Sequence, residues 1–146
     1  MDDKDRQCSY CGTLESLLVD RDLCESCKWK LVKKSDEDSL PNYLRSRIRV
    51  AKARVRKKGL IFSLSLDEAV QIWEEQKGSC AVTGLYMTHT ASNFEFAASL
   101  DRIDNNLGYD KSNVRLVCSR VNTMRNDLDT EMLIFWAKAI CKNNEN

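Results

Sequence analysis

Two Cys-x-x-Cys pairs place the strongest constraint on how this chain can fold. They are Cys8-Ser-Tyr-Cys11 and Cys24-Glu-Ser-Cys27, with twelve residues between them. Two such pairs supply four thiolates, which together close a tetrahedral zinc site and leave no position for water. We therefore expect a structural zinc, on which a segment too small to bury its own core would depend. Two redox-active pairs are the weaker alternative, because no βαβ pattern surrounds either of them.

The overall charge is balanced, but it is unevenly distributed along the chain. The 146 residues include 23 Lys plus Arg and 22 Asp plus Glu, so the net charge is +1. This balance excludes a uniformly basic, histone-like protein, but it does not exclude nucleic-acid binding. The paired spacing of the cysteines and their odd total of seven favour metal binding in a reducing cytoplasm. No stretch approaches the roughly 18 apolar residues that a membrane span requires.

Residues 39–66 form a basic segment with eight cationic side chains and no acidic one. Its apolar residues recur at spacings of four, three and four, which predicts a helix over 43–58 with one apolar face. Pro41 is suited to open this helix and Gly59 to end it. The cations chosen as contacts to a duplex backbone are Arg45, Arg49, Lys52 and Arg56. Such contacts would make affinity fall steeply with salt. The alternative is a solvated helix that pairs with the acidic N-terminal segment.

The rest of the chain predicts a mixture of helices and strands. Ser65 and Glu68 have capping-box spacing at the start of a helix expected over 66–77. Strands are expected over 97–103 and 114–118, joined by a turn at Asn105-Asn106-Leu107-Gly108. A helix should follow from about residue 119, and a last helix should begin near Asp129.

The segment 98–125 reads ASLDRIDNNLGYDKSNVRLVCSRVNTMR. It resembles the core of the HNH, or His-Me finger, endonucleases, particularly their compact phage and prophage forms. Segments 51–59 and 73–84 resemble the lead-in to that core, so that the resemblance covers residues 43–140. It implies an α+β fold with a ββα-metal core and flanking helices, to which the cysteine spacing adds a small N-terminal zinc knuckle. The expected divisions are a four-cysteine zinc-binding segment at 1–38, a basic helix at 39–60 and an HNH-like nuclease domain at 61–146.

The resemblance implies a metal-dependent endonuclease that hydrolyses phosphodiester bonds in DNA. Asp101 at a strand end and Asn122 one turn into the next helix can converge on Mg²⁺ or Mn²⁺, which prefer oxygen ligands. Asn113 matches the middle Asn of the family motif, which braces the loop and orients the catalytic base. Arg120 and Arg125 lie close to the expected cation in sequence and would extend the DNA-binding surface.

Arg102 departs from the family pattern, because the general-base His is expected at that position. Arginine keeps its proton at any working pH and cannot act as a base. The sole His, His89, lies twelve positions before Asp101 and is either a substitute base or an ordinary loop residue. Three accounts stay open. His89 or a metal-bound hydroxide is the base, or Arg102 clamps a phosphate while another group activates water, or the domain binds without cutting.

The alternative function is a catalytically degenerate, zinc-bearing module that binds nucleic acid or protein, such as a phage regulator of host machinery. The Asp101–Asn122 pair favours the endonuclease, whereas Arg102 favours the module. In either case we expect duplex DNA as the partner, with a protein partner also open, no membrane partner and a cytoplasmic location (the host cytoplasm if a phage encodes the chain). If Asp101 holds a catalytic cation, Asp101→Ala should abolish cleavage and leave the fold little changed.

Cys80 and Cys118 match positions where many HNH proteins carry Cys-x-x-Cys pairs that bind structural zinc. Here each pair retains its first Cys alone. Two thiols make a poor zinc site, so both are expected to pack as small hydrophobic side chains.

Overall fold

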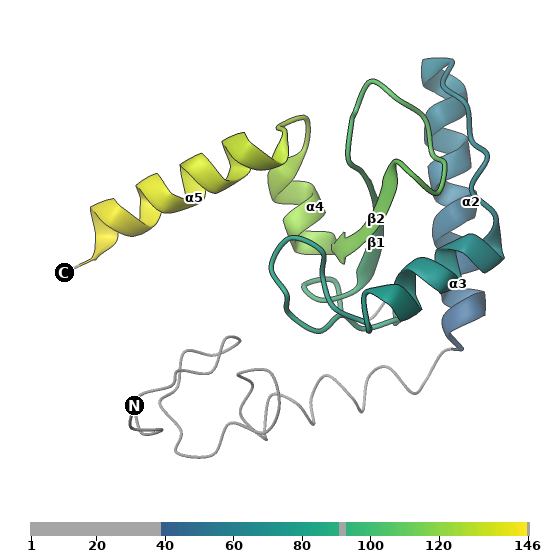
Figure 1. Ribbon diagram of the computed structural model, residues 1–146, viewed down its shortest axis with the longest axis horizontal. Coiled ribbons are helices and arrows are strands. Elements are labelled where there is room, and N and C mark those ends of the chain that lie inside the picture. The colour runs from purple at the N-terminus through teal and green to yellow at the C-terminus, as the bar shows by residue number, and fades with distance from the viewer. Residues whose placement is uncertain (1–38, 91–92, 146) are drawn as a thin grey trace.

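The computed structural model describes residues 39–90 and 93–145. The predicted zinc segment at 1–38, with its four cysteines, lies outside the described residues. The elements, in chain order, are α2 (Leu40–Lys58), α3 (Leu66–Glu75), β1 (Ala98–Arg102), β2 (Val114–Cys118), α4 (Ser119–Arg125) and α5 (Thr130–Asn144). Figure 1 shows α2 and α3 on one side of the hairpin and α4 with α5 on the other. This arrangement confirms the α+β class.

Helix α2 forms where the basic segment predicted it, but it begins three residues earlier, at Leu40. Pro41 lies in its first turn, where its missing N–H costs no hydrogen bond, and Gly59 ends it with a left-handed φ of 67°. The buried face consists of the predicted apolar residues together with Tyr43. The Tyr43 hydroxyl donates a 2.8 Å hydrogen bond to the Ala98 carbonyl. This bond fixes the basic helix against the first strand.

Helix α3 carries the predicted capping box between Ser65 and Glu68 but ends at Glu75, before the expected boundary. The chain leaves the helix because Lys77 and Gly78 both adopt positive φ. Gln76 is thereby able to pair with β2: its amide donates to the Leu116 carbonyl at 2.8 Å and accepts from the Leu116 N–H at 2.9 Å. The Gln76 side chain, together with the Ala81 N–H at 3.0 Å from the same carbonyl, thus pairs with the outer edge of the strand.

The two strands and α4 form a ββα unit. Strands β1 and β2 pair antiparallel, with Ala98 opposite Cys118 and Asp101 opposite Arg115. Helix α4 follows β2 without a loop, and its first residue, Ser119, anchors to the Ala97 carbonyl through both N–H (2.8 Å) and hydroxyl (2.9 Å). This order of hairpin and helix agrees with the predicted ββα core. It places the end of β1 directly beside α4.

Cys80 and Cys118 are buried as free thiols in the main hydrophobic cluster, as expected. The Cys118 backbone N–H donates to the Cys80 sulfur at 3.4 Å. The hydrogen bond between the two side chains lowers the pKa of Cys80 and raises the pKa of Cys118. The pair joins the loop after α3 to the end of β2.

Helix α5 begins where predicted, with the Asp129 carboxylate accepting from the Met132 N–H at 2.7 Å. It extends away from the body of the molecule beyond α4 (Figure 1). Leu133 is its buried residue. In the part of the chain described, no helix is both long enough and apolar enough to cross a membrane.

Candidate nucleic-acid interface and the Asp101 ion-pair cluster

A pocket of about 510 Å³ lies between the C-terminal end of α2 and the ββα unit. Residues far apart in the sequence meet there, because α2 packs against β1. The charged side chains that line it are Arg54, Lys57, Lys58, Asp101 and Arg102, and the carboxamides are Asn105, Asn122 and Asn126. Cations and amide donors therefore make up most of its polar lining, beside apolar residues such as Leu60 and Leu100. A volume of this size accommodates a nucleotide-sized group.

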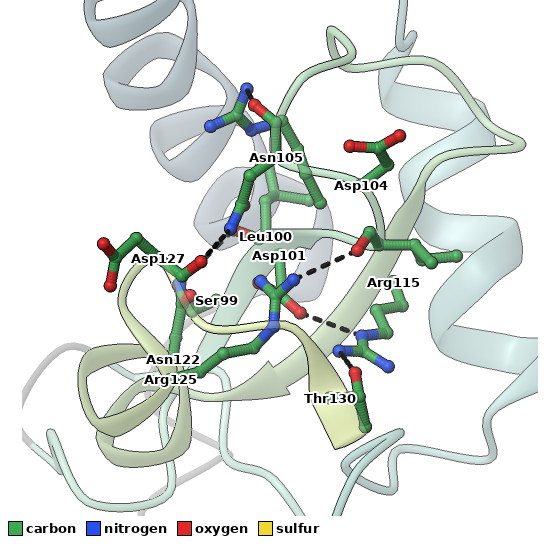
Figure 2. Close-up of polar contacts among 12 residues, drawn as sticks. Ser99, Leu100, Asp101, Asp104, Asn105, Arg115, Asn122, Arg125, Asp127 and Thr130 are labelled. Carbon is green, nitrogen blue, oxygen red and sulfur yellow. Dashed lines mark hydrogen bonds and ion pairs between the residues drawn. The ribbon is translucent and has the colours of Figure 1, made fainter. Parts of the chain in front are cut away.

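Asp101 is buried and bound by two arginines (Figure 2). Arg115, its cross-strand neighbour, donates from Nε to Oδ2 at 2.8 Å, and Arg125 of α4 donates from Nη1 to Oδ1 at 2.6 Å. Arg115 also reaches Thr130 Oγ1 at 2.8 Å, and Arg125 reaches the Ile103 carbonyl at 3.0 Å. One carboxylate thus ties β1 to β2, to α4 and to the first residue of α5.

Asn122 lies beside this cluster, with its amide nitrogen 2.7 Å from Ser99 Oγ and 3.4 Å from the Leu100 carbonyl. Its side chain therefore faces β1, and it lines the same pocket as Asp101. The structure brings these two predicted cation ligands to one place. The two residues differ in whether their oxygens can bind a cation. The Asn122 side-chain oxygen can still act as a ligand, whereas both Asp101 oxygens already accept hydrogen bonds from guanidinium groups.

These residues do not fit Mg²⁺ or Mn²⁺ in the observed arrangement. Two guanidinium groups already compensate the Asp101 carboxylate, and they would repel a dication placed against the same oxygens. Hard cations of this kind are generally held by carboxylates and water. Within residues 39–90 and 93–145, no group of three or more His, Cys, Asp or Glu side chains gathers where a metal ion would sit.

Arg102 points into the loop that joins the two strands. Its Nη1 donates to the carbonyls of Asn105 at 2.9 Å and Leu107 at 2.8 Å, and its guanidinium lies 5.3 Å from the centre of the Tyr109 ring. The side chain thus braces the loop by hydrogen bonds and a cation–π contact. It also lines the pocket. A fixed positive charge thus lies at the position where the sequence resemblance led us to expect a general base.

Asn113 is buried and holds the same loop from the other side. Its Nδ2 donates to the carbonyls of Asp104 (3.1 Å) and Gly108 (2.8 Å), and its Oδ1 accepts from the Asp104 N–H at 2.9 Å. Every one of these contacts is to backbone. The side chain therefore fixes the path of the loop that carries Asn105 into the pocket.

We expect Asn113→Asp to lower the free energy of unfolding by roughly 2–3 kcal/mol, because a carboxylate oxygen would replace a donor that faces two carbonyls. Urea denaturation followed by circular dichroism measures this loss. Asn106→Asp, an equal change at an exposed position of the same loop, is the matched control and should leave stability almost unchanged. Equal stability of the two variants would contradict the bracing role.

Three other predicted site residues lie away from the pocket lining. His89 packs edge-on against Trp73 of α3, with 5.9 Å between ring centroids. Arg120 is exposed and forms a paired contact with Glu95, at 2.9 and 2.6 Å. Arg125, expected on the DNA-binding surface, is instead 1% exposed. Its position three residues after Asn122 turns it toward β1, where the Asp101 carboxylate binds it.

Seven of the eight cations of α2, all except Arg47, fall into two groups on different sides of the helix. Arg54 and Lys58, one turn apart, line the pocket with Lys57. The four chosen from the sequence, Arg45, Arg49, Lys52 and Arg56, recur at spacings of four, three and four, so they share another face. None of these four lines the pocket. The sequence thus predicted the basic helix, but the four cations chosen from it lie on a different face from the one that lines the pocket.

A signal for the Asp101 cluster was present in the sequence. Pairing strands over 98–102 and 114–118 sets Asp101 directly opposite Arg115, and opposite charges are favourable in such cross-strand pairs. Arg125, three positions after Asn122, shares a helix face with it. If Asn122 faces Asp101, then so does Arg125.

No protein family model matches the chain, and no curated protein matches it. Among solved structures, the chain is similar to the rare-cutting HNH restriction endonuclease PacI, with a TM-score of 0.46 and 16% sequence identity. The similarity covers 94% of this chain and 94% of that chain. The proposals for this chain therefore rest on its own residues.

Proposed function

We propose that this chain binds the phosphate backbone of duplex DNA in the pocket between α2 and the ββα unit. The observation that carries the proposal is the convergence of Arg54, Lys57 and Lys58 with Arg102 on one cavity. Arginine, lysine and asparagine side chains are the usual donors to phosphate oxygens. The pocket carboxylate, Asp101, is already compensated by two arginines, so it adds little repulsion for an anion.

Backbone contacts of this kind position a protein on DNA without reading its sequence. Arg54 and Lys58 follow one another by about 6 Å along the helix axis, a separation that allows contact with successive phosphates. Asn105, Asn122 and Asn126 add neutral donors around the same space. Structural zinc at the four N-terminal cysteines remains part of this proposal.

A metal-dependent endonuclease of HNH type is the second candidate. It is favoured by the presence of Asp101 and Asn122 in the same pocket as the cations that would hold DNA. For this function the arginines would have to release the Asp101 carboxylate before a cation could bind there. The observed contacts therefore favour binding over cleavage.

A nicking assay separates the two candidates. The full chain is incubated with supercoiled plasmid and Mg²⁺ or Mn²⁺, and binding to a labelled duplex is measured by fluorescence anisotropy with and without either added cation. The binding proposal expects salt-sensitive affinity that requires neither cation, and intact plasmid.

Nicking that requires the cation would instead establish the endonuclease. In that case Asn122→Ala should abolish nicking and retain most of the affinity, because Asn122 lies outside the buried ion pairs. His89→Ala is the matched control and should leave both measurements unchanged, since His89 packs against Trp73 and not in the pocket. Failure of the full chain to bind duplex DNA would exclude both candidates.

A further inference from the structure

Helix α5 exposes several large apolar side chains. Met132, Phe135, Trp136 and Ile140 are 40, 56, 52 and 62% exposed. Contiguous exposed apolar surface on a folded domain generally marks an interaction site. The helix is held at its first turn, where Leu133 is buried and Thr130 accepts from Arg115. The remainder leads away from the body (Figure 1).

Apart from Ile134, which is 43% exposed on the opposite side of the helix, the exposed apolar residues form one continuous stripe. Met132, Phe135, Trp136, Ala139 and Ile140 occur at positions i, i+3, i+4, i+7 and i+8, the spacing of helices that pack side by side. Phe135 and Trp136 already contact edge-to-face, with 5.3 Å between their ring centroids. The stripe therefore presents a preformed aromatic surface to a neighbouring helix.

Charges beside the stripe indicate what that neighbour is. Glu131 and Lys142 lie near opposite ends of α5 and eleven residues apart, so they lie on nearly the same edge of the helix. Two copies of α5 can pack antiparallel about a two-fold axis that lies between the helices, level with the midpoint of Trp136 and Ala137. In that arrangement Glu131 of each copy faces Lys142 of the other. A self-complementary patch is what a symmetric dimer requires.

We propose that the α5 stripe, defined by Met132, Phe135, Trp136, Ala139 and Ile140, binds the same stripe of a second copy of this chain in antiparallel orientation. Such a dimer buries the exposed aromatic residues and pairs the end charges without a further partner. None of these five stripe residues lines the pocket between α2 and the ββα unit.

Sedimentation equilibrium of the full chain at micromolar concentrations tests this dimer. The wild type should be dimeric, and Trp136→Glu should be monomeric with a native circular dichroism spectrum. The matched control is Ile61→Glu, a similar change at a residue 78% exposed elsewhere on the surface, which should remain dimeric. A monomeric wild type, or a dimer that survives Trp136→Glu, would overturn the proposal.

Charge exchange tests the antiparallel orientation. Glu131→Lys and Lys142→Glu should each raise the dimer dissociation constant about tenfold, because each creates two repulsive contacts. The double variant, which exchanges the two charges, should restore wild-type affinity. In a parallel dimer the single variants would not weaken association, so that result would overturn the orientation. Neither measurement depends on DNA binding.

Discussion

Asp101→Ala should lose roughly 3–5 kcal/mol of stability, because it leaves the buried Arg125 guanidinium and the partly buried Arg115 guanidinium without their counter-charge. Arg125 is 1% exposed and cannot turn to solvent without moving α4. Arg115 would lose its contact across the hairpin. Urea denaturation followed by circular dichroism should therefore show a much lower midpoint, or a chain that fails to fold at room temperature.

Two comparisons identify the ion pairs as the cause. Glu95→Ala removes an exposed carboxylate that also binds an arginine, Arg120, and should leave stability nearly unchanged because that pair is solvated. Replacing Asp101, Arg115 and Arg125 together by Leu, Met and Met should recover much of the loss, since no buried charge then lacks a partner. An Asp101→Ala variant as stable as the wild type would contradict the structural role.

This expectation replaces the simpler one drawn from the sequence, that Asp101→Ala would change chemistry and leave the fold intact. Because the carboxylate lies between two arginines, removing it would change both the stability of the fold and any chemistry in the pocket. Loss of any activity in that variant therefore says nothing about metal binding unless folding is measured beside it. Asn122→Ala is the cleaner probe of the pocket.

Neutralising the pocket side of α2 should strongly weaken DNA binding. Replacement of Arg54, Lys57 and Lys58 by Gln should lower duplex affinity about 100-fold at low salt and reduce the salt slope by about 3, one unit for each lost phosphate contact. Fluorescence anisotropy at several salt concentrations measures both quantities. The effect should be the same for duplexes of unrelated sequence, because phosphate contacts carry no sequence information.

The matched control neutralises Arg45, Arg49 and Arg56, which share another face of the same helix. Both triple variants change the net charge equally, so a difference between them reports position and not total charge. The control should retain most of the affinity and salt dependence. A larger loss of affinity in the control would place DNA on the face of α2 that carries Arg45, Arg49 and Arg56. Equal losses of affinity in both variants would mean that binding is diffuse and that the pocket does not direct it.

The local elements of the fold could be predicted from the order of residues along the chain. Periodic apolar residues, the Ser65–Glu68 capping box, Gly59 and Asp129 set helix positions that the structure reproduces within a few residues. The strand at 114–118 has the predicted bounds, and the first strand is shorter by one residue at each end. These features depend on neighbouring residues, whose hydrogen bonds and side-chain spacing act over one or two turns. Interactions between residues this close in the chain can be predicted from the sequence alone.

The roles of the polar residues depended instead on how the elements pack together. Asp101 has the same spacing to Asn122 whether it binds a cation or two arginines, and the packing of α4 on the hairpin selected the arginines. Packing of α2 against β1 likewise selected which cations line the pocket. Such choices depend on burial, because a buried carboxylate must be compensated by whichever charge lies within hydrogen-bond distance. The distance between the carboxylate and that charge is set by the packing of elements far apart in the chain. Sequence spacing does not specify this packing.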